Sequence, residues 1–144
     1  DAHLLVFTRW DVESAFMSDL IAHGYTIKGS LIWVKDNHTS GDLEGSFAPR
    51  HERIIHAAKG KPKVSPRRDD VFMIARDTTT EHPTEKPVAL LKQLIECTTV
   101  RGELVVDPFA GVASTLVAAK ELDRDWWGCE LDETYWNDGL ERLK

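Results

Sequence analysis

The sequence has little cysteine, no long apolar run and no strong excess of either charge. Cys97 and Cys129 are its only cysteines, and they form no Cys-x-x-Cys pair, which disfavours a zinc knuckle and indicates a reducing, cytoplasmic compartment. No apolar run approaches the roughly 20 residues that cross a bilayer, and no signal peptide opens the chain, so we expect no membrane attachment. Because the formal net charge is −6, nucleic-acid binding would depend on local basic patches.

The length fits one domain. With 144 residues, of which 42% are hydrophobic and 29% charged, the chain can bury a core of its own. We therefore predict a single domain over residues 1–144. Its first residues, which include HLLVFT, already have the pattern of a buried strand, with no cap or turn before them. This abrupt start suggests that the chain is the C-terminal portion of a longer protein.

Hydrophobic periodicity predicts an α/β protein. Short apolar runs, typical of strands, alternate with stretches of helical period. We expect Asp11 to cap the first helix and Gly24 to end it, and Thr84 and Glu85 to stabilise the start of the second. The strand at 51–58 should pair antiparallel with the one before it. The predicted strands lie at 1–10, 25–35, 51–58, 71–75, 104–106 and up to 130, and the predicted helices at 12–22, 88–98 and 113–122.

The turn at 107–111, Asp-Pro-Phe-Ala-Gly, joins a predicted buried strand to a helix. Such βαβ units bind ligands where their strands end. Gly111 would allow a close backbone approach, and the N-terminus of the helix favours an anionic group. Glu130 follows Asp107 at close to the spacing of about 20 residues at which an acidic side chain binds ribose hydroxyls. The full G-x-G-x-x-G fingerprint is absent, so an ordinary crossover with a polar loop is the alternative.

Two segments within residues 36–70 are candidates for DNA contact, the loop at 36–49 and the segment at 59–68. The loop at 36–49 is long, polar and glycine-rich, as functional loops often are. The other segment is basic, and Lys and Arg dominate contacts to DNA phosphates. A solvated loop is the alternative for this segment, because Asp69 and Asp70 follow it at once. Its cations are Lys59, Lys61, Lys63, Arg67 and Arg68.

The string HERIIH at 51–56 contains two histidines and a glutamate but does not have a zinc spacing. A zinc protease helix places histidines at i and i+4. Here His51 and His56 are one residue too far apart. We therefore predict a strand with two ordinary histidines and no metal site.

Two motifs carry a family resemblance. The string DPFAGVAST at 107–115 is similar to the Asp-Pro-Phe-x-Gly-Ser-Gly-Thr-Thr cofactor loop of the S-adenosylmethionine-dependent DNA methyltransferases that modify exocyclic amino groups. HPTEKP at 82–87, upstream of an amphipathic helix, resembles their His-Pro-Thr-x-Lys-Pro element. Val112, Ala113 and Ser114 stand where the family usually has Ser, Gly and Thr. Ala113 is therefore expected to narrow the loop and weaken cofactor binding.

The resemblance implies a Rossmann-like class I methyltransferase fold. Its sheet would be mostly parallel and seven-stranded with one reversed strand, incomplete in this chain, and its cofactor would be S-adenosylmethionine. Thr84 and Lys86 would approach the methionine end, Glu130 would hold the ribose and Leu131 would flank the adenine. The full implied cofactor set is Thr84, Lys86, Asp107, Pro108, Phe109, Ala110, Gly111, Ser114, Glu130 and Leu131.

The family's catalytic tetrapeptide, Asp/Asn/Ser-Pro-Pro-Tyr/Phe/Trp, is nowhere in the sequence. We expect it upstream of Asp1, so the catalytic residues stay unknown. The resemblance implies methyl transfer to the N6 amino group of adenine in duplex DNA, with the base flipped out of the helix. Dimers are common in the family, so a homodimer is a further expectation. The alternatives are a cytosine N4 acceptor, an acceptor other than DNA, and a non-catalytic DNA-binding module.

Overall fold

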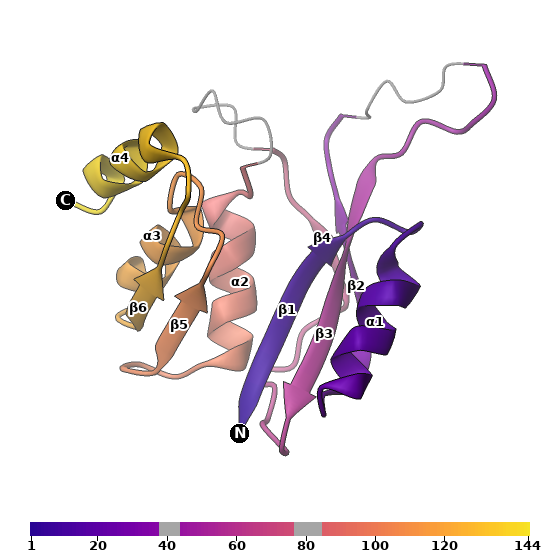
Figure 1. Cartoon of the computed structure of the whole chain (residues 1–144), viewed down its shortest axis with the longest axis horizontal. Coiled ribbons are helices and arrows are strands. Elements are labelled where there is room, and N and C mark those ends of the chain that lie inside the picture. Colours follow the sequence, from indigo (N-terminus) through magenta and orange to yellow (C-terminus); the bar gives the residue numbers. More distant parts are fainter. Residues whose placement is uncertain (38–43, 77–84) are drawn as a thin grey trace. The chain divides into compact units, whose positions relative to one another are not determined.

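The computed structural model describes residues 1–37, 44–76 and 85–144, which form two compact units, Asp1–Ala75 and Arg76–Lys144. Figure 1 shows the elements of both. None of the helices in the described ranges is long and apolar enough to cross a membrane. The elements of the first unit are β1 (Ala2–Thr8), α1 (Glu13–Ala22), β2 (Thr26–Val34), β3 (His51–Lys59) and β4 (Val71–Met73). Those of the second are α2 (Val88–Thr98), β5 (Leu104–Asp107), α3 (Ser114–Glu121), β6 (Asp125–Gly128) and α4 (Glu133–Arg142).

The sheet of the first unit has the strand order β1-β3-β2-β4. β3 lies antiparallel to both of its neighbours, and β2 pairs parallel with β4. The predicted antiparallel pairing of 51–58 with the preceding strand is therefore confirmed, and β3 is the one reversed strand. Because β3 and β2 are the two inner strands, they carry much of the core. The buried apolar residues of this sheet are Trp33, Ile54, Ile55, Ala57, Ala58 and Phe72.

Helix α1 ends as predicted but begins differently. Gly24 has a φ of +80°, and its N–H donates to Ile21 O at 3.0 Å, as expected of a glycine that ends a helix. The predicted cap at Asp11 is wrong. Val12 is the N-cap residue, and its side chain makes no capping bond. The Asp11 carboxylate does not cap the helix because it accepts two bonds from the Arg9 guanidinium.

A histidine on β3, His56, pairs with a histidine on β1, His3. His56 and His3 place their Nε2 and Nδ1 atoms 3.0 Å apart, and Lys28 on β2 adds a positive charge nearby. Burial, then His3 and then Lys28, lower the pKa of His56 below its usual value of 6.5. In the unfolded chain His56 binds a proton at a higher pH than in the fold. Its contribution to stability is therefore present above pH 6.5 and is lost as the pH falls below it.

We expect the free energy of unfolding to fall between pH 7 and pH 5, and His56→Gln to weaken that dependence. Urea unfolding at several pH values measures it. His23→Gln is the matched control, because His23 lies exposed at the end of α1. If His56→Gln and the control keep the same pH profile as the parent protein, the His3–His56 pair does not govern acid stability.

The second unit is built on two parallel strands. β5 pairs with β6 in the register Leu104↔Asp125 to Asp107↔Gly128, which is the predicted βαβ arrangement with α3 as its crossover. A Cβ at Gly128 would lie 2.8 Å from Leu116 Cδ1 and 3.0 Å from Asp107 O. Gly128 therefore lets α3 pack closely onto the strands. Leu116 itself is fully buried, in a cluster with Ala110 and Ala113.

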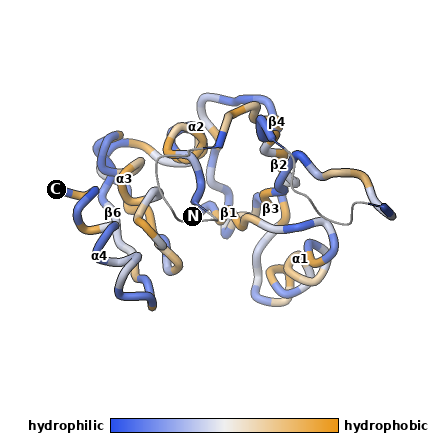
Figure 2. The backbone as a smooth tube through the Cα atoms, turned by 90° about the horizontal axis from the view of Figure 1, so that it is seen from above, coloured by the Kyte–Doolittle hydropathy of each residue, from blue (hydrophilic) through white to orange (hydrophobic). Residues whose placement is uncertain are grey.

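Helix α2 has the predicted bounds and faces the core with Leu90, Leu91, Leu94 and Ile95. Figure 2 shows it largely in the colour of apolar residues. The expected start is wrong in one respect: Pro87 is the N-cap residue, without a side-chain capping bond. Thr84 lies outside the described residues. Helix α4 was not predicted, although Asp132 caps it through bonds from the N–H groups of Thr134 and Tyr135.

Candidate functional site

The turn after β5 is tied to the end of β6 by backbone bonds. The Asp107 carboxylate accepts a hydrogen bond from Phe109 N at 3.0 Å, which fixes a tight Asx turn. Ala110 N donates to Cys129 O at 2.9 Å, and Cys129 N donates to Asp107 O at 3.2 Å. The turn therefore sits at the carboxyl ends of two parallel strands, where open α/β sheets bind ligands.

Two residues with positive φ carry the backbone from this turn into α3. Gly111 has a φ of +53°, and Ala113, the N-cap residue of α3, has a φ of +62°. Gly111 adopts this conformation at little cost, whereas a residue with a Cβ loses about 1–2 kcal/mol in the left-handed region. Ala113, where the related family has glycine, is thus held in its conformation by the surrounding packing. The Ala113 side chain is fully buried in a cluster with Ala110 and Leu116. That this side chain narrows the loop and weakens cofactor binding stays a prediction.

Glu130 bridges this turn to the start of α4. One carboxylate oxygen accepts from Gly111 N at 2.8 Å. The other accepts from Leu131 N at 2.8 Å and Asp132 N at 3.0 Å. Three backbone donors therefore fix a negatively charged side chain beside the turn, at the end of β6. A fixed carboxylate at this place is chemically suited to accept hydrogen bonds from vicinal hydroxyls, as in nucleotide sites.

An apolar rim borders the turn. Phe109 is 87% exposed and Leu131 is fully exposed. Phe109 lies within the turn, and Leu131 follows Glu130 directly. Large apolar side chains exposed next to a few fixed polar groups are typical of small-molecule sites. This rim suits a flat, apolar group such as an aromatic base.

Sequence reasoning missed the residues beneath the turn. The Glu85 side chain is only 1% exposed and lies 2.8 Å from Arg142 Nη1. Ser114 Oγ donates to Glu85 Oε1 at 2.7 Å. Arg142 Nη1 also donates to Val112 O at 2.8 Å and to Ser114 Oγ at 3.1 Å. The amphipathic pattern at 133–142, which ends in arginine, was the signal that could have pointed to Arg142.

The structure brings most of the predicted cofactor residues together. Asp107, Phe109 and Gly111 lie in the turn with Pro108 and Ala110, and Glu130 and Leu131 lie beside it. Ser114 is buried below the turn. Lys86 is half-buried just before α2, and Thr84 lies outside the described residues.

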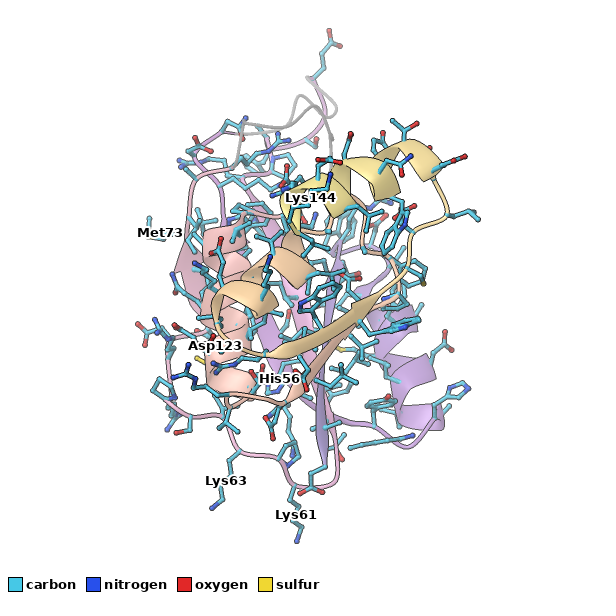
Figure 3. All side chains as sticks on the ribbon, turned by 90° about the vertical axis from the view of Figure 1, so that its left-hand side faces the viewer. His56, Lys61, Lys63, Met73, Asp123 and Lys144 are labelled. Carbon is cyan, nitrogen blue, oxygen red and sulfur yellow. The ribbon has the colours of Figure 1, made fainter. Side chains whose placement is uncertain are left out.

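The two candidate DNA segments leave the first unit at opposite ends of its sheet. β3 begins with His51 opposite Val34, at the carboxyl end of β2, and ends with Lys59 opposite Ala2, at the amino end of β1. The 36–49 loop, of which 38–43 lie outside the described residues, therefore starts at the carboxyl end of β2, and the basic segment follows the opposite end of the sheet (Figure 1). Figure 3 shows Lys61 and Lys63 pointing away from the sheet there.

The family comparison covers nearly the whole chain. A model of the N6/N4 methyltransferase family, described as DNA methylase, matches residues 11–141. The Escherichia coli (strain K12) protein YubD, named as a methylase, is 36% identical over 144 residues, which are 99% of this chain and 62% of YubD. The DNA adenine methyltransferase YhdJ of the same organism is 42% identical over 67 residues, which are 46% of this chain and 23% of YhdJ. The chain thus spans less than two thirds of these relatives.

Solved structures share the fold. A complex of M1.HpyAVI with SAM has a TM-score of 0.88 at 24% identity, covering 99% of this chain and 74% of that one. The cytosine-N4-specific PvuII DNA methyltransferase has a TM-score of 0.84 at 15% identity, and the match covers 99% of this chain and 64% of that one. The predicted Rossmann-like methyltransferase fold is confirmed by these likenesses. Since the family model matches most of its length, the chain belongs to the N6/N4 DNA methylase family.

Proposed function

We propose that this chain is the cofactor-binding part of a DNA methyltransferase that transfers a methyl group from S-adenosylmethionine to the N6 amino group of adenine in duplex DNA. In this proposal both compact units belong to one methyltransferase domain over residues 1–144. The observation that carries it is the turn at the carboxyl end of β5, whose Gly111 N–H is bound by the Glu130 carboxylate at the end of β6.

The residues present fit S-adenosylmethionine. We assign the ribose hydroxyls to Glu130, and the adenine to the apolar rim of Phe109 and Leu131. The methionine end carries a carboxylate, which suits the N-terminus of α3 and the cations and hydroxyls of the 84–87 element, Lys86 and Thr84. Pro108, Ala110 and Gly111 would supply backbone contacts, with Asp107 and Ser114 shaping the loop.

When bound, S-adenosylmethionine supplies an electrophilic methyl group on a sulfonium. The chain's own residues would hold the cofactor and present that methyl to a base flipped out of the duplex. Such catalysis rests on orientation of the reacting groups.

The assignment to adenine rests on sequence similarity. The chain is 42% identical to the E. coli DNA adenine methyltransferase YhdJ over 67 residues. Both acceptors offer an exocyclic amino group of similar chemistry, so cytosine N4 is the alternative. The distinguishing observation is which methylated nucleoside the whole protein produces.

Calorimetric titration of the whole protein with S-adenosylmethionine tests the cofactor assignment. We expect saturable binding with one site per chain. Titration with ATP is the control, because it shares the adenosine but not the methionine. Absence of S-adenosylmethionine binding, in a protein shown to be folded by circular dichroism, would refute the proposed function.

We further propose that the basic segment, Lys59, Lys61, Lys63, Arg67 and Arg68, contacts the phosphates of DNA. All five side chains are exposed. Each phosphate contact contributes about 0.9 to the slope of log Kd against log salt. Lys61→Ala with Lys63→Ala should therefore lower that slope by about 1–2. The control pair is Arg101→Ala with Lys144→Ala, which removes the same charge from exposed sites in the second unit. Equal slopes for the two double variants would show that the segment is a solvated loop that does not contact DNA.

A further inference from the structure

We infer that Glu85 and Arg142 form a positioning pair that holds the cofactor loop in its binding conformation from below. This inference rests on the proposed function, because it concerns how the same loop is kept ready for S-adenosylmethionine. Neither side chain belongs to the predicted contact set. They come from the two ends of the second unit, just before α2 and in the last turn of α4.

Three polar groups converge on one nitrogen of Arg142. Nη1 lies 2.8 Å from Val112 O, 3.1 Å from Ser114 Oγ and 2.8 Å from Glu85 Oε1. Val112 O belongs to the loop itself, and Ser114 is the first residue of α3. The ion pair therefore fixes both the loop carbonyl and the start of the helix that follows it.

Glu85 keeps the Arg142 guanidinium in position beside the loop. Its carboxylate is almost completely buried, and it accepts from Ser114 Oγ at 2.7 Å as well as pairing with Arg142. A buried carboxylate is stable only when it is paired and hydrogen-bonded. Glu85 thus requires Arg142 to stay where it can also bind Val112 O. Since Lys86 follows Glu85 directly, the same pair connects residues 85–87 to the loop.

Close packing of α4 completes the support. A Cβ at Gly139 would lie 2.9 Å from Ala113 Cβ and 3.3 Å from Ala113 N. Glycine at this helix position lets α4 approach the one loop residue that has a Cβ in a left-handed conformation. One turn further on, Arg142 reaches the neighbouring carbonyl of Val112. The helix therefore touches the loop through a steric contact and a charged one.

The test compares three variants of the whole protein by S-adenosylmethionine titration and by thermal unfolding. Arg142→Met keeps the stem but removes all three bonds, and we expect the Kd to rise at least tenfold at a temperature where the variant is folded. Arg142→Lys should bind within about threefold of the parent protein, because one ammonium has three donors for the three acceptors. Arg101→Met is the matched control, since Arg101 pairs with Asp123 at the surface of the same unit.

The outcomes separate the two claims. If the parent protein does not bind S-adenosylmethionine, the proposed function fails. If the parent binds and Arg142→Met lowers the melting temperature while its Kd stays unchanged, Arg142 is structural only and the positioning role is refuted. Should Arg142→Met fail to fold, Glu85→Gln replaces it, because the amide oxygen can still accept from Ser114 while the charge is lost. An unchanged Kd in Glu85→Gln then refutes the role equally.

Discussion

Replacing Arg53 by methionine is expected to lower the free energy of unfolding by about 3 kcal/mol. Arg53 on β3 pairs with Glu13 at 2.7 Å, and Glu13 is buried in the first turn of α1, where Ser30 Oγ also donates to it. Loss of one partner of a buried ion pair costs about 3–5 kcal/mol, because the other charge stays buried without compensation. The Arg53 side chain is 37% exposed, so water can reach the site, and we take the lower end of that range.

The same pair predicts a rescue. Within the described residues, Arg53 Nε is buried without a hydrogen-bond partner, so the pair already contains one unsatisfied donor. Buried ion pairs can often be replaced by neutral groups at little cost. We expect Glu13→Gln combined with Arg53→Met to recover to within about 1 kcal/mol of the parent protein. Urea unfolding of the two single variants and the double variant measures this coupling.

Arg9→Met is the matched control for Arg53→Met. Arg9 also pairs with a carboxylate, that of Asp11, but its side chain is 76% exposed. Exposed pairs contribute about 0–1 kcal/mol. If Arg9→Met destabilises the protein as much as Arg53→Met does, burial of the Glu13 pair is not the cause.

Glu130→Ala is expected to weaken S-adenosylmethionine binding about a hundredfold, and Asp107→Ala about tenfold, which correspond to about 2.8 and 1.4 kcal/mol. Glu130 has the larger effect because it would lose its ribose contact and also release Gly111 N, Leu131 N and Asp132 N. Asp107→Ala releases only Phe109 N from the turn. Calorimetric titration gives both affinities.

Two variants control this comparison. Glu130→Gln keeps one carbonyl acceptor, so its affinity should fall between those of the parent protein and Glu130→Ala. Glu133→Ala removes an exposed carboxylate from the first turn of α4 and should leave the affinity nearly unchanged. If both Asp107→Ala and Glu130→Ala bind S-adenosylmethionine as the parent protein does, Glu130 does not bind the ribose and the turn at 107–111 is not the cofactor site.

Local patterns were sufficient to predict most elements. Helix α2 has the predicted bounds because its apolar spacing is regular over the whole segment. The antiparallel pairing of β3 followed from its place after β2. The cap assignment at Asp11 failed because its carboxylate pairs with Arg9 instead. The assignment at Thr84 failed because α2 begins later, with Pro87 as its N-cap residue. Helix α4 was missed although its amphipathic pattern and the cap at Asp132 are both local signals.

The candidate site was predictable only where it is local. The turn at Asp107 and the acid at Glu130 lie in one βαβ unit, so their spacing was enough to bring them together. Glu85 and Arg142 are separated by most of the second unit, and no short-range pattern links them. The opposite ends at which the 36–49 loop and the basic segment leave the sheet, by contrast, already follow from the predicted antiparallel pairing of 51–58.

Transfer of labelled methyl groups tests the central claim most directly. The whole protein would be incubated with S-adenosylmethionine labelled in its methyl group and with unmethylated duplex DNA, and the nucleosides then separated by mass spectrometry. The account predicts labelled N6-methyladenine, which Glu130→Ala strongly reduces at limiting cofactor. Labelled N4-methylcytosine would correct the acceptor while leaving the cofactor site in place. If a folded protein that binds S-adenosylmethionine labels neither nucleoside in DNA, the assignment of this chain to a DNA amino-methyltransferase is contradicted.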